Sequence, residues 1–218
     1  MKAFKGILGG LCLCAALGSC APSAQNETTL TQDSISINTS EVVIDNIMTR
    51  RSIRKYQPQA VNRDTMQTIL ECGINAPNGQ NKQSWEVRVV DNPEFINGIT
   101  EVYKKANPGV AKDATFKNMF RNAPTVVFIA RDPSYDFSQI DCGLLSGNMM
   151  LSAWSMGIGS CCLGGPVRFM LTDKEAAPYL EKLGFSKGYE LTLCIAFGYP
   201  DETPAAKPRD MGKVKFVD

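Results

Sequence analysis

The 218-residue sequence contains no histidine. Without it the chain cannot form Ser/His/Asp or Cys/His catalytic groups or a histidine-ligated zinc site, and it lacks the side chain that most often transfers protons near neutral pH. An excess of charge is also missing, because 23 Lys and Arg residues are balanced by 22 Asp and Glu residues. That balance gives no general attraction for nucleic acid or an acidic membrane. Any redox or transfer chemistry therefore points to a bound cofactor rather than to side chains alone.

Disulfide and metal motifs are absent as well. There is no Cys-x-x-Cys pair, and an odd number of cysteines follows residue 40, all within apolar runs. These cysteines are Cys72, Cys142, Cys161, Cys162 and Cys194. We interpret them as small buried apolar residues, and no metal site is expected. A redox role for the adjacent pair at 161 and 162 is the alternative, although a disulfide between neighbours would be strained.

The N-terminus has the pattern of a secretory signal. Two lysines precede an apolar stretch of about ten to twelve residues, from Ile7 to Leu17, which is too short to span a bilayer. A signal peptide is predicted over residues 1–19. The sequence Leu-Gly-Ser-Cys that ends it resembles a bacterial lipobox, in which Cys20 becomes the lipidated first residue of the mature chain. Alternatively, Cys20 is one more small residue of a cysteine-containing leader.

Residues 20–41 predict a lipidated cysteine followed by a flexible tether, since they are mostly small and polar without a sustained apolar period. The protein would then be exported and held at the membrane through its lipid alone, at the periplasmic face or elsewhere in the cell envelope. Residues 42–218 are expected to form one domain, because this length supports one substantial core.

Helical and extended periodicities alternate through this domain. Residues 43–48 and 66–76 predict two helices, both expected to pack on a sheet, with Asn62 near the start of the second. Strands are predicted at 85–90, 124–130 and 190–198, the last two as apolar runs of the kind buried on both faces. The fold class is therefore α+β with a central sheet.

A further helix is predicted from Phe137 to Met156, where small and apolar residues cover almost every side. A helix of this kind is buried either in a large core or against another subunit. For so small a domain we favour a subunit interface.

Two basic clusters could bind a phosphate. The first lies where the first predicted helix ends and comprises Arg50, Arg51, Ser52 and Arg54. Forked guanidinium donors and a hydroxyl can surround a phosphate, although basic residues at a helix end are often only a solvated cap. The second cluster, Lys207 and Arg209, lies in an extended C-terminal segment and could add phosphate charge or belong to a solvated tail.

Two other segments suit a flat heterocycle. Asn81 and Gln83 lie in an amide-rich loop over residues 76–85, and amides match the alternating donors and acceptors of a flavin pyrimidine ring. Gly164 and Gly165 are expected in a turn after a short strand, where the backbone can approach a flat ligand closely. Taken alone, each segment could be an ordinary turn.

The order and spacing of these motifs resemble the nitroreductase flavoprotein family, from about residue 42 to the C-terminus. The resemblance rests on Arg-x-Ser-x-Arg, Ala-Pro-(five residues)-Gln-x-Trp, Asp-x-Gly at the start of the long helix, Cys-Leu-Gly-Gly, and Phe-Gly-Tyr-Pro-(six residues)-Lys-Pro-Arg. It implies a nitroreductase-like fold with a central mixed or antiparallel sheet flanked by helices. It also implies an intertwined homodimer with FMN at the interface, each site using residues of both chains.

The resemblance assigns roles to the phosphate clusters. It implies that the FMN phosphate is held by Arg50, Ser52, Lys207 and Arg209, with Arg51 beside them. Arg54 is implied near flavin N1 and O2, where a fixed positive charge stabilises the reduced flavin.

The same comparison assigns the ring contacts. Asn81 and Gln83 correspond to amides that meet the isoalloxazine or the ribityl chain, and Gly164 and Gly165 to the turn whose backbone N–H faces N5. Gly164 replaces a glutamate found in some members, so only a backbone role carries over there. A second departure, Ser84 in place of a proline, is expected to have little consequence.

The substrate pocket is expected from residues 107–120, with Tyr103 and Phe116, but these positions do not name a substrate. The resemblance implies ping-pong hydride transfer from NAD(P)H through flavin N5 to a nitroaromatic, quinone or other conjugated acceptor, with no catalytic side chain. Because soluble NAD(P)H is scarce outside the cell, an exported electron-relay lipoprotein without its own NAD(P)H activity is the alternative. A surface interaction module without flavin is a third possibility.

Overall fold

The computed structural model describes residues 38–217, so the predicted signal peptide, Cys20 and most of the tether lie outside the described residues. The helices are α1 (Thr39–Thr49), α2 (Arg63–Ile74), α3 (Pro93–Ala106), α4 (Pro108–Ala111), α5 (Ser138–Ser155), α6 (Gly164–Thr172) and α7 (Ala177–Lys182). The strands are β1 (Trp85–Val90), β2 (Thr125–Arg131), β3 (Gly159–Cys162) and β4 (Glu190–Gly198). Short 3₁₀ turns lie at Gly79–Asn81, Lys174–Ala176 and Met211–Lys213. These elements confirm the predicted α+β class.

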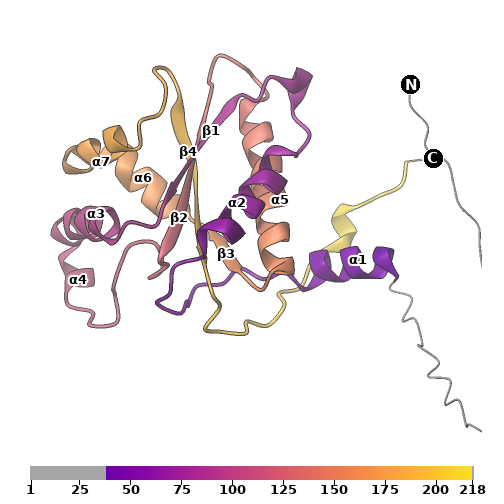
Figure 1. Cartoon of the computed structure of the whole chain (residues 1–218), viewed down its shortest axis with the longest axis horizontal. Helices are drawn as coiled ribbons and strands as arrows, with labels where there is room; N and C mark the ends of the chain where they lie inside the picture. The colour runs from indigo at the N-terminus through magenta and orange to yellow at the C-terminus, as the bar shows by residue number, and fades with distance from the viewer. Residues whose placement is uncertain (1–37, 218) are drawn as a thin grey trace, which may run out of the picture. The chain divides into compact units, whose positions relative to one another are not determined.

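The strands of residues 38–217 form one antiparallel sheet in the order β1-β2-β4-β3 (Figure 1). The strands predicted at 85–90 and 190–198 are confirmed, and the one predicted at 124–130 is shifted by one residue. An isolated parallel bridge joins Ser52 to Ser160, so the segment that follows α1 lies along the outer edge of β3. Ile53 continues this contact by donating its N–H to the Ser160 carbonyl at 3.0 Å.

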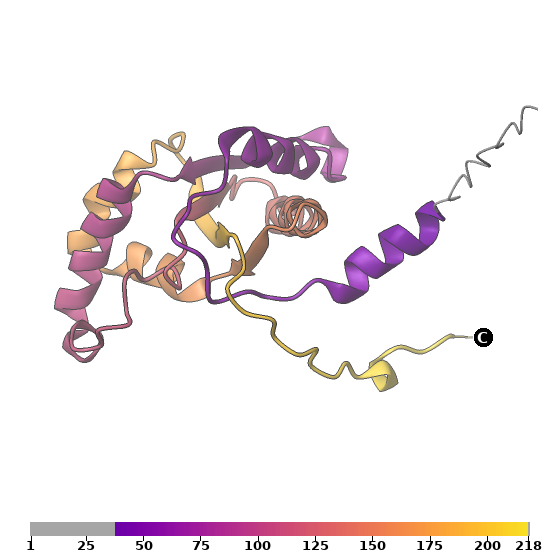
Figure 2. The same ribbon diagram turned by 60° about the horizontal axis from the view of Figure 1, so that its bottom comes forward.

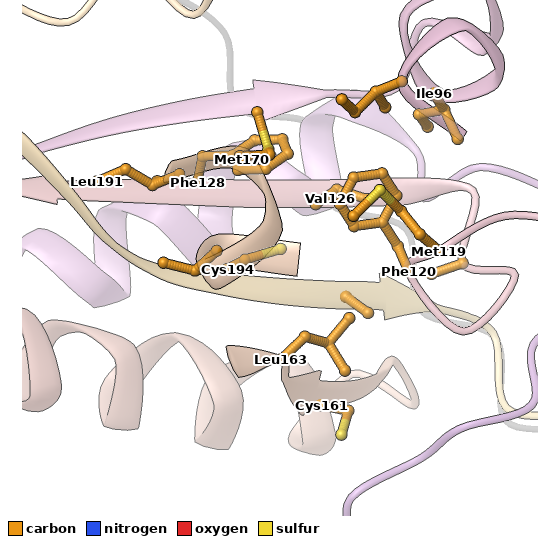
Figure 3. Close-up of a cluster of buried hydrophobic side chains, with 14 of the residues drawn as sticks. Ile96, Met119, Phe120, Val126, Phe128, Cys161, Leu163, Met170, Leu191 and Cys194 are labelled. Carbon is orange, nitrogen blue, oxygen red and sulfur yellow. The ribbon is translucent and has the colours of Figure 1, made fainter. Parts of the chain in front are cut away.

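Both faces of the sheet are covered by helices. Because successive side chains of a strand point to opposite faces, Val126 and Phe128 of β2 pack in one cluster while Val127 and Ile129 pack in another. The first cluster lies with α3, α6 and α7 (Figure 3), and the second with α2 and α5. Figures 1 and 2 show the resulting layers, with the sheet between the two groups of helices. Burying one such side chain contributes about 1.5–3 kcal/mol.

Asparagines begin two of these helices. The Asn62 side chain accepts a hydrogen bond from the Asp64 N–H at 2.8 Å at the start of α2, as predicted. Asn92 does the same for the Glu94 N–H, with Pro93 at the first helical position, and so begins α3. Helix α3 was not among the predicted elements, although these start signals are present in the sequence.

Helix α1 lies against α5 rather than on the sheet. Asn46 donates to the Leu151 carbonyl, and the Trp154 indole donates to the Thr49 hydroxyl, each at 3.0 Å. None of its residues is buried, and its apolar side chains are all more than half exposed. They are Val42, Val43, Ile44, Ile47 and Met48. The expectation that this helix packs on the sheet is wrong, because it contacts α5 instead and the other described residues leave its apolar face exposed.

Helix α5 matches the predicted span to within one residue at each end. Its inner face is buried, with Leu145 and Met149 fully inaccessible, whereas Ile140 and Leu144 on its outer face are 57% and 42% exposed. A Cβ added at Gly143, on this outer side of the helix, would meet no atom within 4 Å. One side of the helix therefore completes the domain core and the other remains open.

The chain after β4 also leaves the sheet. Residues 201–217 are mostly exposed, and Phe216 and Val217 are both 97% exposed. This segment departs toward the same side as α1 (Figures 1 and 2). We refer to α1 and residues 201–217 as the two arms. Within residues 38–217, no helix has the length and apolar character needed to cross a membrane.

Candidate functional site

A cavity of about 1060 Å³ is lined by residues of the β3–α6 connection, α3 and the segment between α4 and β2. It brings together three predicted site residues, Arg54 and the adjacent Gly164 and Gly165, although Arg54 lies more than 100 positions before the glycines in the chain. Tyr103 and Phe116 line the same cavity, as expected for a substrate pocket. The predicted ring-facing residues Arg54, Gly164 and Gly165 therefore line the same cavity as the residues predicted to face the substrate.

Gly164 and Gly165 are the first two residues of α6, not the turn that the sequence suggested. Leu163 precedes them and provides no side-chain cap, so these N–H groups lie in the first turn of the helix, where no intrahelical partner is available. A Cβ added at either glycine would meet no atom within 4 Å. The backbone here is open to the cavity and presents N–H donors and the positive end of a helix dipole.

Arg54 is positioned by the strand-like segment that follows α1. Its guanidinium donates to the Ser52 carbonyl at 3.1 Å, and its backbone N–H donates to the Glu202 carboxylate. Ile53 next to it is 1% exposed and packs so closely on Gly159 that an added Cβ there would lie 2.7 Å from it. This packing fixes the backbone of Arg54 while its side chain lines the cavity.

The predicted phosphate residues do not line this cavity within the single chain. Arg51 instead donates to the Met48 and Arg50 carbonyls at 2.7 and 2.9 Å, which closes the end of α1 as a helix cap. Arg209 donates to the Lys207 carbonyl at 3.2 Å, and both side chains are exposed on the C-terminal arm. The residues predicted to bind phosphate are therefore carried by the arms or by the chain next to them.

The amide loop is likewise separate from the cavity. Asn81 and Gln83 are exposed, and neither lines it. Gln80, Asn81 and Gln83 adopt φ values of 54°, 53° and 49°, in the left-handed region that non-glycine residues rarely occupy. Such strained positions persist where the surroundings over-determine them, and they cluster at functional sites.

A buried carboxylate holds this loop. Asp141 at the start of α5 is 2% exposed, and its two oxygens accept from the Gly79 N–H at 3.0 Å and the Ser84 hydroxyl at 2.9 Å. The side-chain oxygen of Asn78 also accepts a hydrogen bond from the Gln83 N–H at 3.0 Å. The sequence placed Asp141 at a helix start but did not predict this role. The serine that departs from the family pattern is therefore one of the two groups that fasten the loop.

Tyr56 and two cysteines contribute to the cavity wall. Burial raises the pKa of Tyr56, so its hydroxyl stays protonated and donates to the Ile53 carbonyl. Cys161 is buried and Cys162 is exposed, and both are free thiols. Desolvation raises the pKa of Cys162, which disfavours the reactive thiolate.

The interpretation of all five cysteines as buried residues is correct for Cys142, Cys161 and Cys194. It is wrong for Cys162, and Cys72 is only partly buried. Neighbouring residues of a strand point to opposite faces, which places one member of the adjacent pair inside and the other outside.

The sequence profile of the nitroreductase family matches residues 47–199. The chain belongs to the nitroreductase family. Family membership confirms the resemblance drawn from the motifs and places the protein among the oxidoreductases. The matched range includes Arg54 and the α6 glycines but not Lys207 and Arg209.

The chain is also similar to individual proteins, both in sequence and in structure. An NADPH-flavin oxidoreductase from Vibrio harveyi is 27% identical over 172 residues, covering 76% of this chain and 69% of that protein. A nitroreductase from Bacteroides fragilis with bound FMN superposes with a TM-score of 0.69 at 27% identity, covering 81% of this chain and 98% of that one. An FMN-dependent nitroreductase from Clostridium difficile superposes with a TM-score of 0.68 at 28% identity, covering 82% of this chain and 100% of that one. The nitroreductase-like fold is thereby confirmed.

Proposed function

We propose that the protein is an FMN-dependent oxidoreductase that transfers electrons from NAD(P)H to a nitroaromatic, quinone or other conjugated acceptor. The observation that carries this proposal is the cavity in which a fixed cation, Arg54, meets the open backbone at Gly164 and Gly165. The FMN-bound relatives of the same fold support the choice of cofactor.

The residues present fit a flavin. A planar ring system needs a surface without projecting side chains, and the two glycines that begin α6 offer one together with N–H donors. A reduced flavin carries negative charge, which the Arg54 guanidinium and the helix dipole of α6 would stabilise. When bound, FMN supplies the two-electron chemistry by accepting a hydride and passing it on. Among the cavity residues, none is required to transfer a proton in this scheme.

Phosphate binding would involve the arms. Arg50, Ser52, Lys207 and Arg209 supply forked guanidinium, ammonium and hydroxyl donors suited to a phosphate. Because they lie on the arms or beside α1, their convergence requires the arms to be fixed against something. We propose that a second copy of the chain fixes them.

The proposed homodimer explains the open apolar surface. The outer face of α5, the apolar side of α1 and the C-terminal arm all expose large apolar side chains, which a soluble monomer rarely groups together. A second copy would cover them and would bring its own amide loop, with Asn81 and Gln83, toward the first cavity. The strained geometry of that loop supports a binding role.

We further propose that the domain is exported and membrane-anchored through lipid on Cys20. The predicted signal and lipobox support this location. Replacing Cys20 with serine should move the protein from the membrane fraction to the soluble fraction, and unchanged membrane association of C20S would refute lipid anchoring. Export bears on the electron donor, because soluble NAD(P)H is scarce outside the cytoplasmic membrane, and a partner protein that supplies electrons is the alternative donor.

The decisive experiment is the visible spectrum of the purified full-length protein before and after anaerobic addition of NADH or NADPH. A flavin spectrum bleached by either nicotinamide would support the oxidoreductase. Bleaching by dithionite alone would favour an electron relay supplied by a partner. A protein that stays colourless after addition of FMN would refute the proposed cofactor.

A further inference from the structure

Four cations and three carboxylates line the cavity, so its lining carries an excess of positive charge. Lys117 and Arg121, in the segment between α4 and β2, line the cavity, and Arg54 and Lys55 line it from the segment after α1. Within residues 38–217, no salt bridge involves any of these four cations. An unpaired cation in a concave site attracts anionic ligands more strongly than one on an open surface.

Two carboxylates that line the same cavity are already bound by other groups. Asp91 forms a two-pronged pair with Arg63 at 2.8 and 2.9 Å, which lowers the pKa of Asp91. Asp113 accepts from the N–H and the hydroxyl of Thr115 at 2.8 and 2.7 Å. The third lining carboxylate, Asp201, lies beside Lys55, to whose carbonyl its N–H donates at 3.0 Å. Asp113 keeps its charge because Thr115 is neutral, but within residues 38–217 neither Asp113 nor Asp201 forms a salt bridge with Lys117 or Arg121, so both cations are available to a ligand.

Arg121 occupies a backbone position that would suit a glycine. Arg121 and Asn122 have φ values of 61° and 62°, and only glycine and, to a lesser degree, asparagine adopt this region easily. The turn is fixed by Asn122, whose side chain accepts from the Lys117 and Asn118 N–H groups at 2.8 and 2.9 Å. It also donates to the Thr115 carbonyl at 2.9 Å. A large cation held in a strained, rigid turn indicates that its side chain has a role that a glycine could not fill.

An aromatic surface adjoins these cations. Tyr103 and Phe116 stack with ring centroids 5.9 Å apart and an interplanar angle of 23°, and both line the cavity. Phe116 directly precedes Lys117, so a flat apolar surface and a positive charge come from the same short segment. This pairing suits a ligand that is planar at one end and anionic at the other.

We propose that the acceptor is a planar conjugated molecule that bears a carboxylate or sulfonate, with its anionic group bound by Lys117 and Arg121 and its ring beside Tyr103 and Phe116. This inference rests on the proposed oxidoreductase function and names the acceptor class of that site. Binding of a dinucleotide phosphate by the same two cations is the competing outcome that the experiment must separate.

The test compares 4-nitrobenzoate with 4-nitrobenzamide, which share a ring and a nitro group but differ in charge. In Lys117→Gln and Arg121→Gln, kcat/KM for 4-nitrobenzoate should fall about three- to fivefold each, the range of a partly exposed ion pair. The value for 4-nitrobenzamide and the rate of flavin bleaching by NADPH should stay unchanged. Lys112→Gln is the matched control, since it removes the same charge five positions from Lys117 without touching the cavity lining.

Arg121→Gly separates loss of the side chain from loss of folding, because it removes the backbone strain together with the side chain. We expect an unchanged or higher melting temperature together with the same loss for 4-nitrobenzoate. Equal losses for both acceptors, or slower bleaching by NADPH alone, would overturn the proposal.

Calorimetry separates this inference from the proposed function. The full-length protein should bind 4-nitrobenzoate more tightly than the amide, and K117Q and R121Q should each reduce the difference even in a protein that NAD(P)H cannot reduce. In that case the proposed anion site would be supported and the proposed reaction with NAD(P)H would be refuted. Equal binding of the two compounds by the unaltered protein would refute the anion site directly.

Discussion

The central sheet and the two arms use apolar residues in opposite ways. In β2 and β4, residues such as Phe128 and Ile195 are fully buried by helices of the same chain. In the arms, residues of comparable size such as Ile47 and Phe216 are 51% and 97% exposed. Within residues 38–217, the sheet therefore forms a core with its own helices, whereas the arms carry apolar surface that the other described residues leave exposed.

The predicted cofactor residues divide along the same boundary. Arg54, Gly164 and Gly165 are held at the cavity by contacts with the core. Lys207 and Arg209 are on an arm and make no contact with the cavity in the single chain. If the arms bind the phosphate as proposed, cofactor binding and assembly should be coupled, because the contact that fixes the arms would also complete the phosphate site.

Phe128→Ala should have the largest effect on stability. Removing a fully buried ring leaves a cavity and costs about 3–5 kcal/mol of unfolding free energy. Denaturant unfolding measures this loss, which should not depend on protein concentration. Phe216→Ala on the arm should give a smaller loss that grows as the protein is diluted, because that ring is expected to be buried only in the dimer. If both variants lost a similar free energy of unfolding that did not depend on protein concentration, the proposed difference between core and arms would be refuted.

Ile140→Glu should dissociate the proposed dimer. A carboxylate placed in an apolar interface must be desolvated without a partner, and we expect the dimer dissociation constant to rise by about a hundredfold, or roughly 3 kcal/mol. Sedimentation or light scattering reports the mass, and FMN affinity should fall in parallel. Leu171→Glu is the control, since Leu171 on α6 is 51% exposed, close to the 57% of Ile140, but lies on the opposite side of the sheet. A dimer unaffected by I140E would remove α5 from the interface.

Asp141→Asn tests how the strained loop is held. The amide keeps one acceptor oxygen but replaces the other with a donor, so a loop contact is lost and the cost is about 1–3 kcal/mol. Unfolding free energy and FMN affinity should both decrease. Asp136→Asn, at an exposed position five residues earlier, should change neither. If D141N bound FMN normally, the loop would serve stability alone.

Much of the sheet could be predicted because its signals are local. The segments 85–90 and 190–198 have strand-like patterns bounded by turn residues, and both became strands at those limits. Helix α6 was missed because two glycines disfavour a helix start, yet burial of Val167 and Met170 stabilises it through tertiary packing. The loss of local helix preference is small compared with that burial.

The candidate site was predictable only in part. Convergence of Arg54 with Gly164 followed from the family pattern, but the role of Asp141 depends on a bond to Gly79 across 62 positions, which no local pattern encodes. The amphipathic pattern of α1 correctly indicated a helix. It could not reveal that its apolar side would remain uncovered, because a periodicity does not identify what lies against it.

The smallest predicted effect isolates the contribution of the C-terminal arm. Arg209→Gln keeps a polar, though shorter, side chain but removes its charge and forked geometry, so FMN should bind about tenfold more weakly, or roughly 1.4 kcal/mol. Fluorescence titration with FMN measures the affinity, and sedimentation should show an intact dimer. Lys215→Gln removes a charge from the same exposed arm and should leave the affinity unchanged, which separates a specific phosphate contact from the general field of the arm. If both variants bound FMN normally, the arm would act only in assembly, and the phosphate would have to be held by the chain next to α1.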